Sequence, residues 1–150
     1  MTTDDPLRLV ALDAEDLAVL AAHVQDAVVK LSDIVWRPRE KRVVLALNRF
    51  VWEAASAGRR RSRTWQRRRA ALRFERVEAM RSSGIDRQRP DDVLSLLTIR
   101  FELREPPGGC VELVFAGGAA MRLDVECLEA ELTDLGAAWS TPSKPQHGFG

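Results

Sequence analysis

The sequence contains little of what most catalytic and metal-binding sites use. Its 150 residues include no tyrosine, two histidines and two cysteines. The histidines, His23 and His147, and the cysteines, Cys110 and Cys127, lack the paired spacings typical of a zinc site or a disulfide framework. No serine, cysteine or histidine stands at a spacing that predicts a nucleophile beside its base. We therefore expect no metal, no cofactor and no catalytic residues, and an enzyme is the least supported class of function.

A long apolar run is missing as well. No segment approaches the roughly 20 apolar residues needed to span a bilayer. The acidic start, residues 1–6, lacks the basic and then apolar pattern of a signal peptide. These absences predict a cytoplasmic protein without a membrane span. The length fits a single domain, which we expect over residues 1–136, followed by a flexible tail over residues 137–150.

What the sequence does contain is alternating apolar residues, which predict strands. Strands are expected over residues 7–12, 27–36, 42–52, 70–80, 93–104, 111–115 and near 121–123. Helical spacing predicts one helix over residues 14–24, begun by Asp13, and a second over 125–135, ended by Gly136. The expected class is α+β: a mainly antiparallel, strongly bent sheet of about six or seven strands with a helix near each end. A roll like that of a pleckstrin-homology domain is one form of it.

Two polar residues, Asn48 and Arg49, interrupt a strand that is otherwise apolar on both faces. A polar group at such a place must be hydrogen-bonded or lie at the end of the sheet. One interpretation is that the two residues line a pocket in which Arg49 binds a carboxylate or phosphate. The other, which we favour, is that Arg49 forms a buried, purely architectural pair with a carboxylate.

The sharpest local feature is a group of seven arginines around one tryptophan, in a polar loop expected over residues 53–69. Its members are Arg59, Arg60, Arg61, Arg63, Trp65, Arg67, Arg68 and Arg69. Guanidinium groups neutralise phosphates and an indole stacks on an unpaired base, so RNA or single-stranded DNA is one candidate partner. An anionic membrane surface is another. The simplest interpretation is a solvated loop whose arginines pair with acids such as Glu126, Glu129 and Glu131.

Charge is distributed unevenly along the chain. Residues 1–90 carry 19 basic and 12 acidic side chains, a balance of +7, whereas residues 91–150 carry 4 and 10, a balance of −6. Opposed charges favour contact within the fold, self-association or a charged partner. Together with the missing catalytic groups, this predicts a binding or accessory domain that works through protein–protein contact. Nucleic-acid binding through residues 59–69 is the alternative.

Three stretches carry a resemblance to a known family. They are residues 47–53, LNRFVWE; residues 115–118, FAGG, leading into 122–129, RLDVECLE; and a tail with Trp139, Pro145 and His147. On these stretches the chain resembles the uncharacterised alphaproteobacterial family called domain of unknown function 2948. The likeness spans nearly the whole chain, which implies one domain of bacterial, cytosolic origin. It implies no activity, ligand or catalytic residue.

Overall fold

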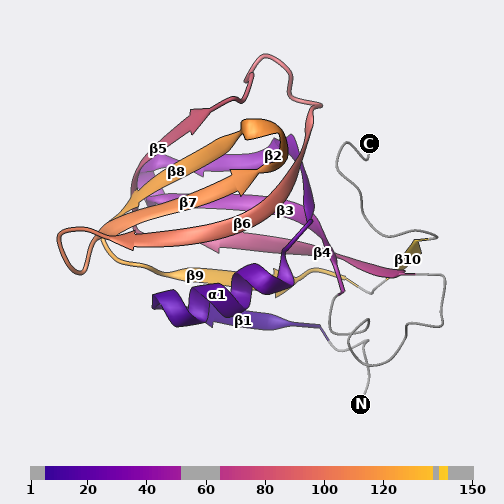
Figure 1. The fold of residues 1–150 in the computed structure, drawn as a ribbon, viewed down its shortest axis with the longest axis horizontal. Coiled ribbons are helices and arrows are strands. Elements are labelled where there is room, and N and C mark those ends of the chain that lie inside the picture. The colour runs from indigo at the N-terminus through magenta and orange to yellow at the C-terminus, as the bar shows by residue number, and fades with distance from the viewer. Residues whose placement is uncertain (1–5, 52–64, 137–138, 142–150) are drawn as a thin grey trace.

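The computed structural model describes residues 6–51, 65–136 and 139–141 (Figure 1). These residues form one α-helix, α1 (Ala14–His23), and ten strands. The strands are β1 (Arg8–Ala11), β2 (Val28–Arg37), β3 (Arg42–Phe50), β4 (Trp65–Phe74), β5 (Val77–Ser83), β6 (Val93–Leu103), β7 (Gly109–Phe115), β8 (Ala120–Val125), β9 (Ala130–Asp134) and β10 (Trp139–Thr141). Two short 3-10 turns, η1 (Pro38–Glu40) and η3 (Ala116–Gly118), join neighbouring strands. No helix among the described residues is long and apolar enough to cross a membrane.

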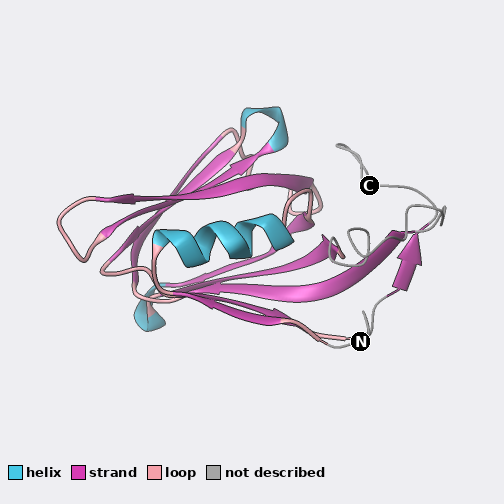
Figure 2. Ribbon diagram, turned by 60° about the horizontal axis from the view of Figure 1, so that its bottom comes forward, coloured by secondary structure: helices cyan, strands magenta, loops and turns pink. Residues whose placement is uncertain are grey.

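The strands form one antiparallel path that bends into two layers. Their order is β1-β9-β4-β3-β2-β6-β7-β8-β5, and β10 pairs with β4. The layers are joined where Val28–Lys30 of β2 pairs with Val93–Ser95 of β6. Helix α1 contacts both β1 and β6 and lies across the opening between the layers (Figures 1 and 2). The coarse prediction of a strongly bent, mainly antiparallel sheet with an N-terminal helix is therefore confirmed.

The hydrophobic core lies between the two layers and under α1. Leu45 and Leu47 of β3 and Leu113 of β7 are fully buried, as the alternation of each strand predicts. The helix begins at Asp13, whose side chain accepts a hydrogen bond from the Asp16 backbone N–H at 2.8 Å. It buries Leu17, Leu20 and Ala21 in the same core. The helix thus closes the core on one side of the roll.

The predicted strand over residues 70–80 is two strands in different layers. β4 pairs with β3 and β9, whereas β5 pairs with β8. Arg76 lies between them with a φ of 61°, and the next N–H, of Val77, donates to the Lys41 carbonyl at 2.9 Å. The alternation of apolar residues changes phase between Phe74 and Val77, where the chain passes from one layer to the other. β4 also begins earlier than expected, at Trp65, so residues 65–69 are strand rather than loop, and residues 52–64 lie outside the described part.

The predicted C-terminal helix over residues 125–135 is wrong. This segment contains β9, which pairs with β1 on one side and with β4 on the other. Without β9, β1 and β4 would each have an unpaired edge. Pairing with both strands therefore outweighs the helical spacing of the segment. Ala130 and Leu132 point into the core, while Leu135 is 56% exposed. The sheet therefore has ten strands rather than six or seven, and no helix covers its C-terminal end among the described residues.

Candidate functional site

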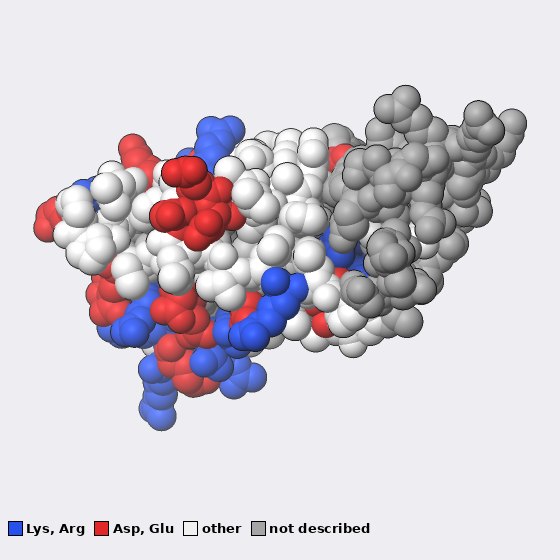
Figure 3. Space-filling model, turned by 90° about the horizontal axis from the view of Figure 1, so that it is seen from below, with Lys and Arg blue, Asp and Glu red and all other residues white. Residues whose placement is uncertain are grey.

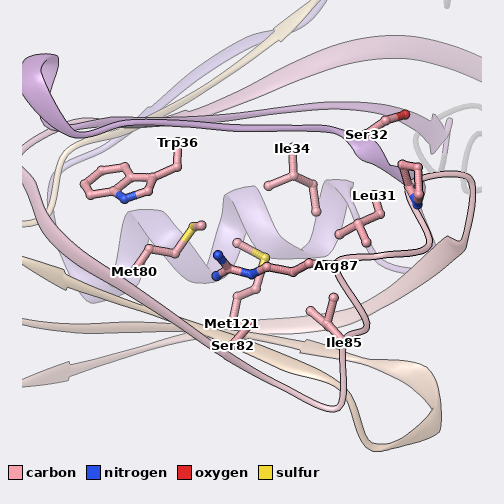
Figure 4. A pocket seen from close by; sticks show the side chains of 10 residues that line it. Leu31, Ser32, Ile34, Trp36, Met80, Ser82, Ile85, Arg87 and Met121 are labelled. Carbon is pink, nitrogen blue, oxygen red and sulfur yellow. The ribbon is translucent and has the colours of Figure 1, made fainter.

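The two layers separate at one place and leave a cleft there. β2 pairs with β6 only through Val28–Lys30, and β5 ends the strand order. Between the later part of β2 and β5 lies a cavity of about 290 Å³ (Figure 4). Its lining comprises Leu31, Ser32, Ile34, Trp36, Met80, Ser82, Ile85, Arg87, Pro90 and Met121. We call it the β2–β5 cleft.

The walls of the β2–β5 cleft are apolar and only half-buried. Ile34 and Trp36 come from β2, Met80 from β5 and Ile85 from the following loop, and all four pack against the core while remaining partly exposed. Met121 of β8, 2% exposed, lies at the base. Exposed apolar surface that continues a core is a common feature of binding sites.

An irregularity in β2 opens the β2–β5 cleft. Val29 pairs with Leu47 and Ile34 pairs with Leu45, so four residues of β2 stand opposite one residue of β3. The displaced residues turn toward the loop that follows β5. Within them, the Leu31 N–H donates to the Asp92 carbonyl and the Ser32 N–H to the Pro90 carbonyl, each at 2.9 Å. In the bulge, the backbone of β2 therefore forms hydrogen bonds with the loop after β5 in place of pairing with β3.

That loop, residues 84–92, holds Arg87 over the β2–β5 cleft. The Asp86 carboxylate accepts from the Gln88 N–H at 3.0 Å, and the Asp86 carbonyl accepts from the Arg89 N–H at 3.0 Å. The loop starts at Gly84, whose φ is 70°. Figure 4 shows the Arg87 side chain reaching across the opening toward Met121. Among the described residues the Arg87 guanidinium has no hydrogen bond or ion pair, unlike Arg89, which lies 3.4 Å from Asp92.

The predicted pocket residues Asn48 and Arg49 lie elsewhere, at the end of β3. The Arg49 side chain is 1% exposed and donates to Asp134 of β9, from Nε to Oδ1 at 2.8 Å and from Nη2 to Oδ2 at 3.0 Å. Arg68 Nη1 is 3.5 Å from Asp134 Oδ2. The Asn48 amide oxygen instead accepts from Arg69 Nη1 at 3.2 Å. The structure thus groups two arginines around one carboxylate inside the protein.

The predicted arginine segment is divided by the start of β4. Arg59, Arg60, Arg61 and Arg63 lie outside the described residues, and Trp65 is described only as the first residue of β4. Arg67 and Arg68 are buried, 3% and 1% exposed, and burial lowers the pKa of the Arg67 guanidinium. Arg69 is half-buried, with Nη2 3.1 Å from Asp33 Oδ2. These three arginines therefore belong to the sheet rather than to an exposed loop.

The acids expected to meet that segment have other partners among the described residues. Lys41 Nζ lies 2.8 Å from Glu126, Arg76 lies 3.5 Å from Glu129, and Glu131 accepts from Arg8 and Arg73. The hydrogen bond from Lys41 lowers the pKa of the Glu126 carboxyl. A second hollow has four basic and four acidic lining residues: Glu40, Lys41, Arg42, Arg73, Glu75, Arg76, Glu126 and Glu129. In the view of Figure 3 the two signs are intermingled in the lower left, and a separate group of acidic side chains lies above them.

The thiols and potential metal ligands form no second site in the described residues. Cys110 and Cys127 are free, and burial raises the pKa of the Cys110 thiol. A high thiol pKa makes a poor nucleophile at neutral pH. No group of three or more His, Cys, Asp or Glu residues that could hold a metal occurs in this part of the chain.

Sequence reasoning missed the β2–β5 cleft because its lining comes from three separate segments. β2, the β5 strand with its loop, and β8 meet there only after the sheet has bent. One signal was present: Ile85 is the single large apolar residue in the polar stretch 81–92. An apolar residue in such a loop indicates that the loop covers an apolar surface.

Comparison with family models matches residues 7–147 to one family, described as protein of unknown function (DUF2948). This is the family that residues 47–53, 115–118 and 122–129 and the tail resemble. A search of curated proteins and a search of solved structures found no match.

Proposed function

The chain belongs to the DUF2948 family, and from this premise we propose that it is a non-catalytic binding domain that recognises a partner protein through the β2–β5 cleft. The family description names no activity, so the proposal rests on the geometry of this chain. The cleft combines an apolar lining with a cation that has no partner in the described residues.

The observation that carries the proposal is the set of apolar side chains left half-exposed beneath Arg87. When an apolar group of a partner covers Ile34, Trp36 and Met80, their exposed surface is removed from water. This burial contributes a binding free energy of about 25 cal/mol per Å² of apolar surface. A volume of about 290 Å³ lies at the lower end of small-molecule sites, which begin near 300 Å³. It fits one or two protein side chains, and the guanidinium of Arg87 favours a carboxylate beside them.

Site-directed photo-crosslinking tests the proposal in the native cell. A benzoylphenylalanine replaces Ser32, an exposed residue in the lining of the β2–β5 cleft, and in a control chain it replaces Arg100, an exposed residue of β6 outside the lining. We expect a protein adduct from position 32, none from position 100, and loss of the adduct when Arg87→Glu is added. Equal adducts from both positions, or adducts with small molecules only, would contradict recognition of a protein at this site.

The sequence-based alternative, nucleic-acid binding through residues 59–69, stays a prediction. Its most basic part, residues 59–63, lies outside the described residues. It predicts binding of RNA or single-stranded DNA with a log–log salt slope of about −3 if four phosphates are engaged. Alanine in place of Arg59, Arg60, Arg61 and Arg63 should then abolish that binding, and unchanged binding would dismiss the alternative.

A further inference from the structure

We propose that the partner binds as an extended strand along the outer edge of β5, with its apolar side chains in the β2–β5 cleft and an acidic side chain beside Arg87. This inference rests on the proposed function and adds the conformation of the partner, its direction and its sequence pattern. It follows from the free edge of β5 among the described strands, the spacing of the lining residues and the position of Arg87.

The outer edge of β5 is available for pairing. Among the described strands, β5 ends the strand order and pairs with β8 alone, from Ala79 opposite Asp124 to Ser83 opposite Ala120. At its start, the Val77 N–H already donates to the Lys41 carbonyl. Beyond that point every second residue of an edge strand directs its N–H and C=O away from the sheet. Such an edge is a template for another extended chain, and recognition by strand addition uses it.

The side chains of β5 direct an added strand toward the β2–β5 cleft. Met80 and Ser82 are two residues apart, and both line the cavity. Side chains of neighbouring strands that share a face lie about 4.5–5.5 Å apart at Cβ. Alternate residues of an added strand would therefore enter the cavity beside Met80 and Ser82. A cavity of 290 Å³ holds about ten non-hydrogen atoms, if each takes the roughly 30 Å³ of a water molecule. That is enough for two branched aliphatic side chains or one aromatic side chain.

Arg87 gives the added strand a direction. β5 runs toward the loop that carries Arg87, since it ends at Ser83. Every strand pair in the described sheet is antiparallel, and antiparallel pairing is slightly more stable per residue. The first residues of an antiparallel partner would lie at the Ser83 end, near Arg87. The expected pattern is therefore an acidic residue followed by apolar residues at alternate positions.

Selection from a displayed library of seven-residue peptides tests this inference. The library is selected on the full chain, with counter-selection on the Ser82→Trp variant, whose larger side chain fills the cavity. The best peptide is then synthesised in three forms: unmodified, N-methylated at one residue, and N-methylated at the next residue. Successive N–H groups of a strand point to opposite sides, so only one methyl group can block pairing with β5. We expect that form to bind at least tenfold more weakly and the other to bind as the unmodified peptide does.

Two variants of matched charge test the role of Arg87. Arg87→Glu should weaken the unmodified peptide at least tenfold. Arg39→Glu should leave binding unchanged, because Arg39 is exposed, has no hydrogen bond or ion pair among the described residues and does not line the cavity. Equal binding by both variants would overturn the acidic contact. Amide NMR spectra of the two variants check that both remain folded.

The outcomes separate this inference from the proposed function. If a selected peptide shifts the methyl resonances of Met80 and Met121 but both N-methylated forms bind equally, strand addition is wrong and protein recognition at the cleft stands. If every peptide that binds the parent chain is removed by counter-selection on the Ser82→Trp variant, the cleft does not recognise peptides and both proposals fall.

Discussion

Removal of the Asp134 carboxylate should destabilise the protein more than removal of any surface acid. Four donors meet this group: Arg49 Nε at 2.8 Å, Arg49 Nη2 at 3.0 Å, the Leu7 N–H at 2.7 Å and Arg68 Nη1 at 3.5 Å. The side chains of Asp134, Arg49 and Arg68 are each at most 1% exposed. In Asp134→Ala both guanidinium groups lose this carboxylate while they remain buried.

The expected cost follows from that burial. Removing one partner of a buried ion pair costs about 3–5 kcal/mol, against a total stability of about 5–15 kcal/mol for a domain. In a chain of this size each kcal/mol lowers Tm by about 2–4 °C, so Tm should fall by roughly 6–20 °C. The matched control is Asp124→Ala. The Asp124 side chain is 39% exposed, and its Oδ1 lies 2.9 Å from Arg81 Nη2. An exposed pair of this kind contributes about 0–1 kcal/mol.

Urea denaturation of the parent chain and the two variants measures both changes. The Asp134→Asn variant keeps the shape of the side chain but places an NH₂ group among donors, so it should lose most of the same free energy. Equal stability of Asp134→Ala and Asp124→Ala would refute the reasoning, because it would mean that these buried arginines do not need the carboxylate.

Two further predictions concern a glycine and an exposed ion pair. In Gly109→Ala the new Cβ would meet the backbone oxygen of Glu102 and the Phe101 ring, the latter at 2.7 Å, so the free energy of unfolding should fall by about 1–3 kcal/mol. Gly136→Ala meets nothing within 4 Å and should change stability by less than about 1 kcal/mol in the same denaturation assay. For the ion pair, the hydrogen bond from Lys41 lowers the pKa of Glu126, so its stabilising effect is complete above the ordinary carboxyl pKa and is lost as the pH falls through the lowered value. In Lys41→Met a ¹³C NMR titration should show the Glu126 pKa returning upward, and an unchanged titration curve would mean that Lys41 is not the cause.

Local signals predicted the elements that depend on neighbouring residues. Asp13 caps α1 through a bond to Asp16, three residues on, and the helix forms where its spacing predicts it. The turn between β7 and β8 has positive φ at Gly117 and Gly118, as a glycine pair between two strands indicates. Both features are determined within a few residues, so they can be predicted without knowledge of the rest of the fold.

The errors occur where distant partners decide the structure. Residues 125–135 have helical spacing, but β1 and β4 together supply a ladder on both sides of β9. Residues 65–69 are too polar to predict a strand, yet Arg68 is buried beside Asp134 and Arg69 is bound by Asp33 and Asn48. A charged residue is compatible with a sheet when its partner lies on another strand. The pairing of Arg68 with Asp134 spans 66 positions, and no local pattern encodes it.

The candidate site shows the same limit more strongly. Arg49 attracted attention because it interrupts an apolar strand, and its partner is Asp134, 85 positions away. Arg87 carried no such signal, since it is one arginine of 20 in the sequence and stands in an ordinary polar loop. Its distinction is the lack of a partner within the part of the chain that the structure describes, and that property exists only once the other charged groups have been placed in space.

The position of β9 has a consequence for the synthesis of this protein. Arg8 of β1 pairs with Thr133, 125 positions later in the chain. At about 5–20 residues per second, β1 stays unpaired for on the order of ten seconds while the ribosome makes the rest. During that interval β4 also lacks β9 and exposes a second edge. The newborn chain is therefore open to aggregation until β9 emerges, and a cell should keep a chaperone on it for that time.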